Sequence, residues 1–137
     1  MKALIIEDES IAARRLEKML RELDPELEIV GCLESIESVF QWWEQHTPPD
    51  IIFQDIHLAD GSSFEIFNYL NIQQPIIFIT AYDQYAIQAF KVNAVDYLLK
   101  PIKRKELAQA LSKYKKNQEP GLDYSRLAEM MKKDSYD

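Results

Sequence analysis

Side chains fit for handling phosphate follow four short apolar runs of this chain. They are Glu7 and Asp8 after Ala3 to Ile6, Asp55 after Ile51 to Gln54, Thr80 after Ile76 to Ile79, and Lys100 after Tyr97 to Leu99. If the runs are neighbouring parallel strands, three carboxylates, a hydroxyl and an ammonium meet at one edge of a sheet. Open α/β folds place their ligand sites at such an edge. The set therefore favours phosphoryl transfer.

An alternation of strand-like and helix-like patterns must position these side chains. The apolar runs predict strands at Ala3 to Ile6, Leu27 to Leu33, Ile51 to Gln54, Ile76 to Ile79, and Val95 to Leu99. Helical spacing predicts a helix after each strand, faced by Leu16 and Leu20, Val39 and Trp43, Phe64 and Phe67, Tyr85 and Phe90, and Leu107 and Leu111. For the first helix, Ser10 is the expected N-cap and Asp24-Pro25 the expected stop.

Strands that are separated by helices must be parallel, and right-handed crossovers leave few topologies. The sequence therefore predicts a (βα)5 fold, a doubly wound five-stranded parallel sheet of flavodoxin-like strand order 2-1-3-4-5. We expect this domain to cover residues 1–116. Residues 117–137 contain the breaker Pro120-Gly121 and a short amphipathic stretch from Tyr124, so they are expected to form a partly helical linker toward a domain outside this sequence.

Composition narrows the function classes. The chain has 137 residues, 47% of them hydrophobic, which suits one globular domain. The net charge of −7 repels nucleic acid phosphates, so this segment should bind DNA poorly by itself. No run is long enough for a membrane span and the start does not resemble a signal peptide, which predicts a cytoplasmic protein. The single cysteine, Cys32, lies in an apolar stretch and is expected to be buried and inert.

The polar residues at the strand ends closely resemble those of the phosphoacceptor receiver domain of two-component response regulators. Glu7-Asp8, Asp55, Thr80-Ala81 and Lys100-Pro101 occur in the order of that family. The segments 80–86 and 94–102 are similar more narrowly to the LytR/AlgR class, whose receivers precede a LytTR DNA-binding domain. The resemblance implies a switch in transcription regulation whose DNA-binding output domain is absent from this sequence.

The resemblance also implies a role for each residue of the site. Asp55 is expected to accept a phosphoryl group from a partner sensor histidine kinase, and Lys100 to pair with Asp55 and then with the phosphate. Mg²⁺ is the expected cofactor, held by Asp8, Asp55 and the backbone carbonyl of His57, with Glu7 acting through a water. Crowding of three carboxylates should raise their proton affinity by mutual repulsion. The chain would catalyse only its own phosphorylation and dephosphorylation.

The family further implies how the signal leaves the site. Thr80 is expected to move toward the phosphate, and Tyr97 to rotate into the space that Thr80 leaves. This movement would repack the face made by the fourth helix, the fifth strand and the fifth helix, which is also the expected surface of a homodimer. The peptide bond between Lys100 and Pro101 is expected to be cis.

Other interpretations of the same residues stay open. Glu7-Asp8 could be an acidic helix start, Asp55 a loop cap, and Tyr97 an ordinary core residue. The chain could be a pseudo-receiver that binds proteins without phosphate, or a phosphohydrolase with an aspartyl nucleophile. The hydrolase usually needs a second acid two residues after the nucleophile, where this chain has His57. Ala59 and Ser63 replace the proline and the glycine that receivers often carry after the acceptor.

Overall fold

The structure of the chain is a computed structural model that describes residues 1–81 and 94–117. The helix expected around Tyr85 and Phe90, most of the segment 80–86, and the tail from 118 onward lie outside the described residues. Among the described residues, no helix is long and apolar enough to cross a bilayer.

Five parallel strands form the central sheet. The strands are β1 (Lys2–Ile6), β2 (Glu28–Leu33), β3 (Ile51–Asp55), β6 (Ile76–Thr80) and β7 (Ala94–Leu99). Their order, β2-β1-β3-β6-β7, is the predicted 2-1-3-4-5 order, and all neighbouring pairs are parallel. The helices α1 (Ser10–Leu23), α2 (Ile36–Gln45) and α4 (Arg104–Asn117) connect or follow them. The predicted doubly wound fold is thereby confirmed.

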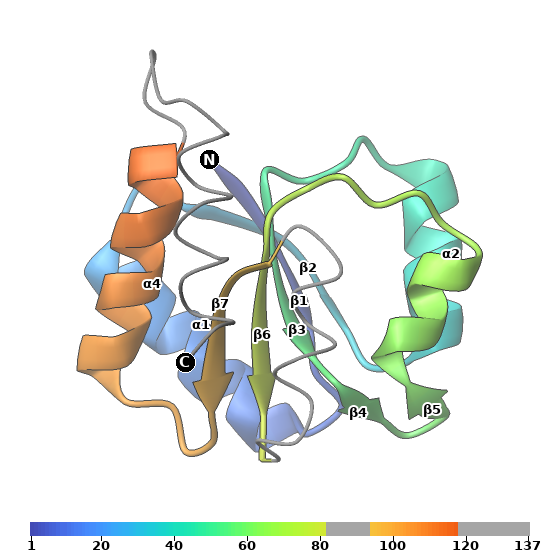
Figure 1. The fold of residues 1–137 in the computed structure, drawn as a ribbon, viewed down its shortest axis with the longest axis horizontal. Helices are drawn as coiled ribbons and strands as arrows, with labels where there is room; N and C mark the ends of the chain where they lie inside the picture. Colours follow the sequence, from blue (N-terminus) through green and yellow to red (C-terminus); the bar gives the residue numbers. More distant parts are fainter. Residues whose placement is uncertain (82–93, 118–137) are drawn as a thin grey trace, which may run out of the picture.

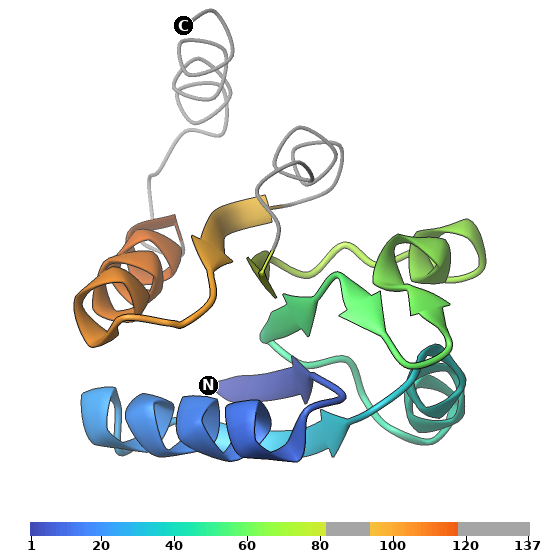
Figure 2. The same ribbon diagram turned by 90° about the horizontal axis from the view of Figure 1, so that it is seen from below.

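Two apolar layers cover the sheet, one on each face (Figure 1). On one face, α1 and α4 pack their apolar sides on strand residues such as Ile5 and Phe53. On the other face, α2 and the 3-10 helix η1 (Ser63–Asn68) pack on Leu4, Ile52 and Phe78. Strands β6 and β7 run downward in Figure 1, so Figure 2 views the carboxyl edge of the sheet, where ligand sites are expected.

The connection after β3 differs from the sequence prediction. A two-stranded antiparallel hairpin, β4 (His57–Leu58) and β5 (Gly61–Ser62), follows the strand directly. Gly61 has a φ of 136°, a conformation that side-chain-bearing residues rarely adopt. The segment faced by Phe64 and Phe67 is a six-residue 3-10 helix and not a full α-helix. Spacing of apolar residues does not distinguish these two kinds of helix when the segment is this short.

Helix boundaries follow local signals with one correction. The predicted N-cap, Ser10, is the first residue of α1, while Glu9 takes the cap position without a side-chain cap bond. The end of α1 at Leu23, just before Asp24, agrees with the predicted stop. Helix α2 begins with a capping box between Ser35 and Ser38.

The edge position of β2 overturns the expectation for Cys32. The side chain forms no disulfide and is exposed, because β2 is the edge strand and has a neighbour on one side only.

Gly31 in the same strand lies where the packing leaves little room for a side chain. A Cβ at this position would lie 2.9 Å from Leu4 Cδ1 and 3.0 Å from Trp42 Nε1. Trp42 is the buried indole of the pair Trp42-Trp43.

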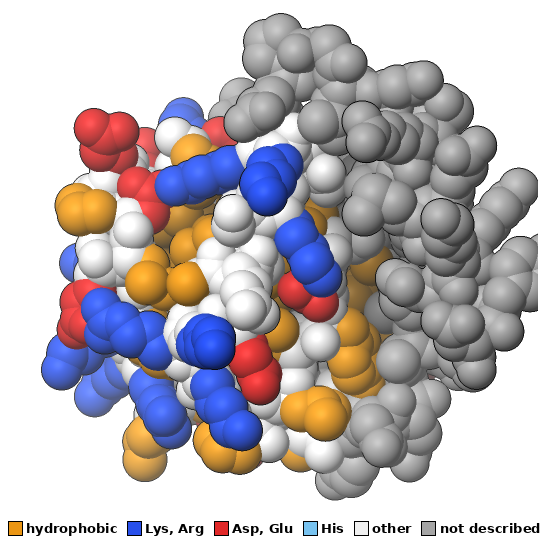
Figure 3. Space-filling model, turned by 60° about the vertical axis from the view of Figure 1, so that its left-hand side comes forward, with side chains coloured by type: hydrophobic (Ala, Val, Ile, Leu, Met, Phe, Trp, Pro, Cys, Tyr) orange, Lys and Arg blue, Asp and Glu red, His pale blue; other side chains and the backbone are white. Residues whose placement is uncertain are grey.

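Lysine and arginine side chains gather on the face made by α1 and α4, with fewer acidic groups between them (Figure 3). Several of these bases pair with acids of the same chain, as Arg104 does with Glu22, Lys113 with Asp96 at 3.2 Å, and Lys115 with Asp24 at 3.2 Å. Their charges are therefore partly neutralised within the domain.

Candidate functional site

Three carboxylates meet where β1 and β3 end. Glu7 and Asp8 directly follow β1, and Asp55 is the last residue of β3, the neighbouring parallel strand. One carboxylate oxygen from each of the three lies within 4.8 Å of the others. The Glu7 and Asp55 residues are buried, with 4% and 5% of their surface exposed, while Asp8 is half-buried. The apolar strands thus bring the three acids of the sequence prediction into one cluster, which we call the pocket.

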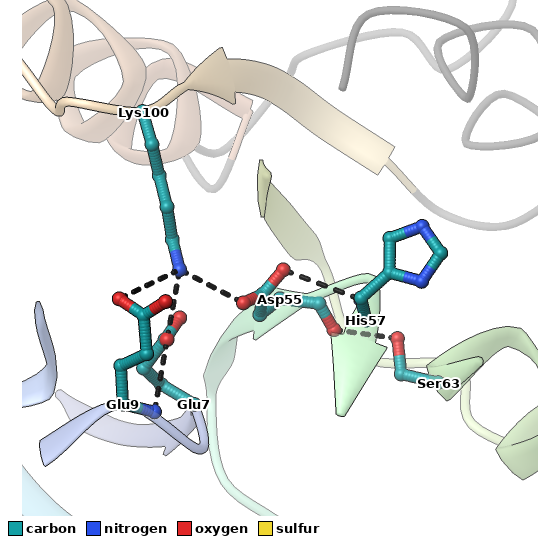
Figure 4. Close-up of polar contacts among 6 residues, drawn as sticks. All are labelled: Glu7, Glu9, Asp55, His57, Ser63 and Lys100. Carbon is teal, nitrogen blue, oxygen red and sulfur yellow. Dashed lines mark hydrogen bonds and ion pairs between the residues drawn. The ribbon is translucent and has the colours of Figure 1, made fainter. Parts of the chain in front are cut away.

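Lys100 reaches this pocket from the end of β7. Its Nζ donates to Glu7 Oε1 at 2.8 Å and to Asp55 Oδ2 at 2.9 Å, and lies 4.0 Å from Glu9 Oε2 (Figure 4). The backbone N–H of Lys100 donates to the carbonyl of Thr80 at 2.7 Å, and the peptide bond to Pro101 is cis. The ammonium is therefore shared between acids of β1 and β3, and it pairs with Glu7 as closely as with Asp55.

Burial dominates the electrostatics of the pocket. Removal from water raises the pKa of Glu7 to about 7, with the negative charge of Asp55 adding to the rise and the Lys100 hydrogen bond opposing it. The sequence argument put mutual repulsion first, whereas loss of water is the larger cause. Burial alone would lower the pKa of Lys100, but its hydrogen bonds to Glu7 and Asp55 raise it above the usual value, so the ammonium stays charged.

The remaining predicted residues lie at distinct places around the pocket. Thr80 is fully buried at the end of β6, one residue beyond the register partner of Asp55. His57 is exposed, and its backbone N–H donates to Asp55 Oδ1 at 3.3 Å. Tyr97 lies in the middle of β7, half-buried against the α2 layer and away from the carboxyl edge.

Three residues to which the sequence reasoning gave no role contact this region, and a fourth is hydrogen-bonded to the start of α2. Ser63 donates its hydroxyl to the carbonyl of Asp55, Gln54 donates to Ser63, and Glu9 donates its backbone N–H to Glu7. Asp60 accepts hydrogen bonds from the first two N–H groups of α2, at 2.9 and 3.2 Å. A polar residue inside an apolar run, as at Gln54, and a serine at a position where receivers often have glycine, as at Ser63, were the available signals.

The donor set fits a small divalent cation. Three carboxylates offer only hard oxygen ligands, which is the set that Mg²⁺ prefers. A cation would also compensate the charge of Glu7, which the buried site accepts poorly by itself. Glu7, Asp8 and Asp55 could therefore hold such an ion.

Comparison with known proteins shows to which family of proteins the chain is similar. The profile of the response regulator receiver domain matches residues 3–112. The sensory transduction protein LytT of Bacillus cereus is 43% identical over 126 residues, covering 90% of this chain and 50% of LytT. The transcriptional regulatory protein LytR of Staphylococcus aureus is 41% identical over 119 residues, covering 82% of this chain and 46% of LytR. The chain thus spans about half the length of these relatives.

A solved structure shares the fold. The response regulatory domain of protein mrkE from Klebsiella pneumoniae superposes with a TM-score of 0.72 at 32% sequence identity. The match covers 85% of this chain and 96% of that domain, so the likeness extends over nearly the whole of that domain.

Proposed function

Because this chain belongs to the response regulator receiver family, with relatives of the LytT and LytR type, we propose that it is a phosphorylation-dependent signalling switch. In this proposal Asp55 accepts a phosphoryl group from a sensor histidine kinase. The observation that carries it is the buried cluster of Glu7, Asp8 and Asp55 with the Lys100 ammonium between two of the acids. Burying charged groups together lowers the stability of the fold, and binding of a cation and an anion at the cluster would compensate this cost.

The transfer itself is a displacement at phosphorus. A carboxylate oxygen of Asp55 forms the new bond to phosphorus, and the bond from phosphorus to the kinase histidine nitrogen breaks. The electron pair of that bond leaves with the imidazole, and the product is an acyl phosphate on Asp55. When bound by Glu7, Asp8, Asp55 and the carbonyl of His57, Mg²⁺ supplies charge neutralisation for the phosphoryl oxygens.

Lys100 contributes at both stages. Before transfer it pairs with Asp55 and Glu7, which holds the acceptor carboxylate at the end of β3. After transfer its ammonium can follow the negative charge to a phosphoryl oxygen, while the backbone bond of Lys100 to Thr80 keeps the residue at the end of β7. This shift of partner needs no new cation from outside the chain.

Thr80 and Tyr97 form the proposed link from the site to the surface. Thr80 ends the strand beside Asp55, one residue beyond the register partner of Asp55, and in this proposal its buried hydroxyl donates to the phosphate. Tyr97 lies on β7, in register with Phe78 of the same strand as Thr80. A change at Thr80 can thus be passed to Tyr97 through one pair of strands, and a bias of a few kcal/mol would change the dominant arrangement.

The proposal also extends to the whole protein, beyond this sequence. We infer a cytoplasmic regulator in which residues 117–137 lead to a LytTR domain that binds DNA, since LytT and LytR are about twice as long as this chain. A homodimer through β7 and its flanking helices is part of the proposal. The residues between β6 and β7, where the sequence predicts a helix of that face, lie outside the described residues.

Phosphorylation by a small donor tests the proposal without the kinase. The chain is incubated with acetyl phosphate, with and without Mg²⁺, and its intact mass is measured. We expect a mass increase of one phosphoryl group that needs Mg²⁺, is absent in Asp55→Asn, and persists in Asp96→Asn, a control acid that pairs with Lys113 outside the pocket. A folded wild-type chain that takes up no phosphate would refute the switch and favour a phosphate-independent binding module.

A further inference from the structure

A buried hydrogen-bond network ties the acceptor strand to the residue that begins η1. The Ser63 hydroxyl donates to the backbone carbonyl of Asp55 at 2.6 Å, a contact drawn in Figure 4. Gln54 Nε2 donates to Ser63 Oγ at 3.0 Å and to the Ser63 carbonyl at 3.3 Å. Gln54 and Ser63 have no exposed surface. Because Gln54 supplies a donor to the hydroxyl, the single proton of Ser63 is directed to Asp55.

A second contact of Ser63 closes the same segment. Its backbone N–H donates to the carbonyl of Ile56 at 2.6 Å. One residue therefore holds the carbonyl groups of two consecutive residues at the point where β3 passes into the hairpin. His57 comes next. Its N–H donates to Asp55 Oδ1, and its carbonyl is the one that the proposed function assigns to the metal. The direction of that carbonyl depends on the backbone of Asp55 and Ile56, which Ser63 holds through its two hydrogen bonds.

Gln54 shows that this network is not explained by stability alone. Its Oε1 is buried without a hydrogen-bond partner among the described residues. A buried acceptor that stays unpaired destabilises a fold, and an apolar side chain of similar size avoids that penalty. The amide at position 54 thus costs stability, while its Nε2 orients the Ser63 hydroxyl.

We propose that Ser63, oriented by Gln54, is a positioning residue that holds Asp55 and the His57 carbonyl in the arrangement needed for Mg²⁺, an inference that rests on the proposed function of the pocket. The contact runs through the backbone of Asp55, so Ser63 touches neither the phosphate nor the ion. Its loss leaves a buried carbonyl without its donor and frees residues 55–57 to shift relative to Glu7 and Asp8.

Three variants test this role. Ser63→Ala removes the hydroxyl and keeps the backbone bond to Ile56. Gln54→Met removes both the orienting donor and the unpaired acceptor. Ser62→Ala is the matched control, because the neighbouring hydroxyl accepts from the Phe64 N–H at 3.3 Å and, in the described part of the chain, makes no side-chain hydrogen bond to β3. For each, the Mg²⁺ dissociation constant is measured from the His57 amide resonance, together with urea stability and the rate of phosphorylation by acetyl phosphate.

We expect Ser63→Ala and Gln54→Met to weaken Mg²⁺ binding by about ten-fold, the usual effect of losing a group that supports metal ligands. Gln54→Met should be at least as stable as the wild type, so that its lost affinity is not a consequence of unfolding. Ser62→Ala should bind Mg²⁺ like the wild type.

Unchanged Mg²⁺ affinity in both Ser63→Ala and Gln54→Met would overturn the inference. So would an affinity loss confined to Ser63→Ala that follows its loss of stability. The affinity comparison is independent of phosphate uptake. A wild type that binds Mg²⁺ but accepts no phosphate would therefore refute the proposed function, while the dissociation constants would still decide the role of Ser63.

Discussion

Neutralising Glu7 should make the metal-free chain more stable at neutral and higher pH. The carboxyl is buried, and its pKa is raised from 4.5 to about 7 in the folded state. The difference of about 2.5 units, at about 1.4 kcal/mol per unit, gives a penalty of about 3 kcal/mol for ionising Glu7 in the fold. Glu7→Gln has the shape of the protonated acid and avoids this penalty. Its amide oxygen can still accept from Lys100.

The pH dependence gives the prediction its sign. Below pH 4.5, Glu7 is protonated in both the folded and the unfolded chain, so variant and wild type should be equally stable. As the pH rises from 4.5 through 7, the unfolded chain releases the proton while the folded chain keeps it. The wild type therefore loses stability relative to Glu7→Gln across this window, and the difference is complete above pH 7.

Urea unfolding at pH 5 and pH 8 without divalent cations measures this difference. Glu7→Gln should exceed the wild type by about 3 kcal/mol at pH 8 and by less than about 1 kcal/mol at pH 5. Glu44→Gln, at an exposed position of α2, is the control and should show no such change. A wild type that is as stable as Glu7→Gln at pH 8 would refute the reasoning that the ionised, buried Glu7 carboxylate destabilises the fold.

For three further substitutions, the structure indicates whether stability or a pKa should rise or fall. Asp60→Ala removes the acceptor of two N–H groups at the start of α2, and should lower the free energy of unfolding by about 1 kcal/mol in urea titration; an unchanged value would contradict the capping role. Gly31→Ala places a Cβ against Leu4 and Trp42, and should cost about 1–3 kcal/mol and shift the tryptophan fluorescence, whereas wild-type stability would show that the site has room. Lys100→Met removes the hydrogen bond that lowers the pKa of Glu7, so a carboxyl-carbon NMR titration should find that pKa higher than in the wild type, and an equal or lower value would speak against the pairing.

The fold was accessible from the sequence because the central strands β1, β3 and β6 are mostly apolar and buried. A run such as Ile76 to Ile79 is buried on both faces of the sheet, which is typical of parallel strands between helices. The same runs end at polar residues, so the pocket of Glu7, Asp8, Asp55 and Lys100 followed from strand order alone. The strand order is confirmed by the sheet, and the chemical roles of the pocket residues stay predictions.

What the sequence did not show depends on contacts between distant residues or on local geometry. The Ser63 hydroxyl meets Asp55 because the chain folds back at Gly61. Asp60-Gly61 is typical of a turn, but it does not indicate which residues the returning chain contacts. Cys32 has apolar neighbours, which favoured burial, yet the edge position of its strand exposes it. Which acid pairs with Lys100 also depends on side-chain positions, and the structure adds Glu7 to the expected Asp55.

Chemical trapping of the phosphorylated residue tests the central claim most directly. The chain is treated with acetyl phosphate and Mg²⁺ and then with borohydride, which reduces an aspartyl phosphate to homoserine, and its peptides are mapped by mass spectrometry. The proposed switch predicts homoserine at position 55 and at no other position. Phosphate trapped on another residue, or an unmodified Asp55 in a chain that remains folded, would contradict it.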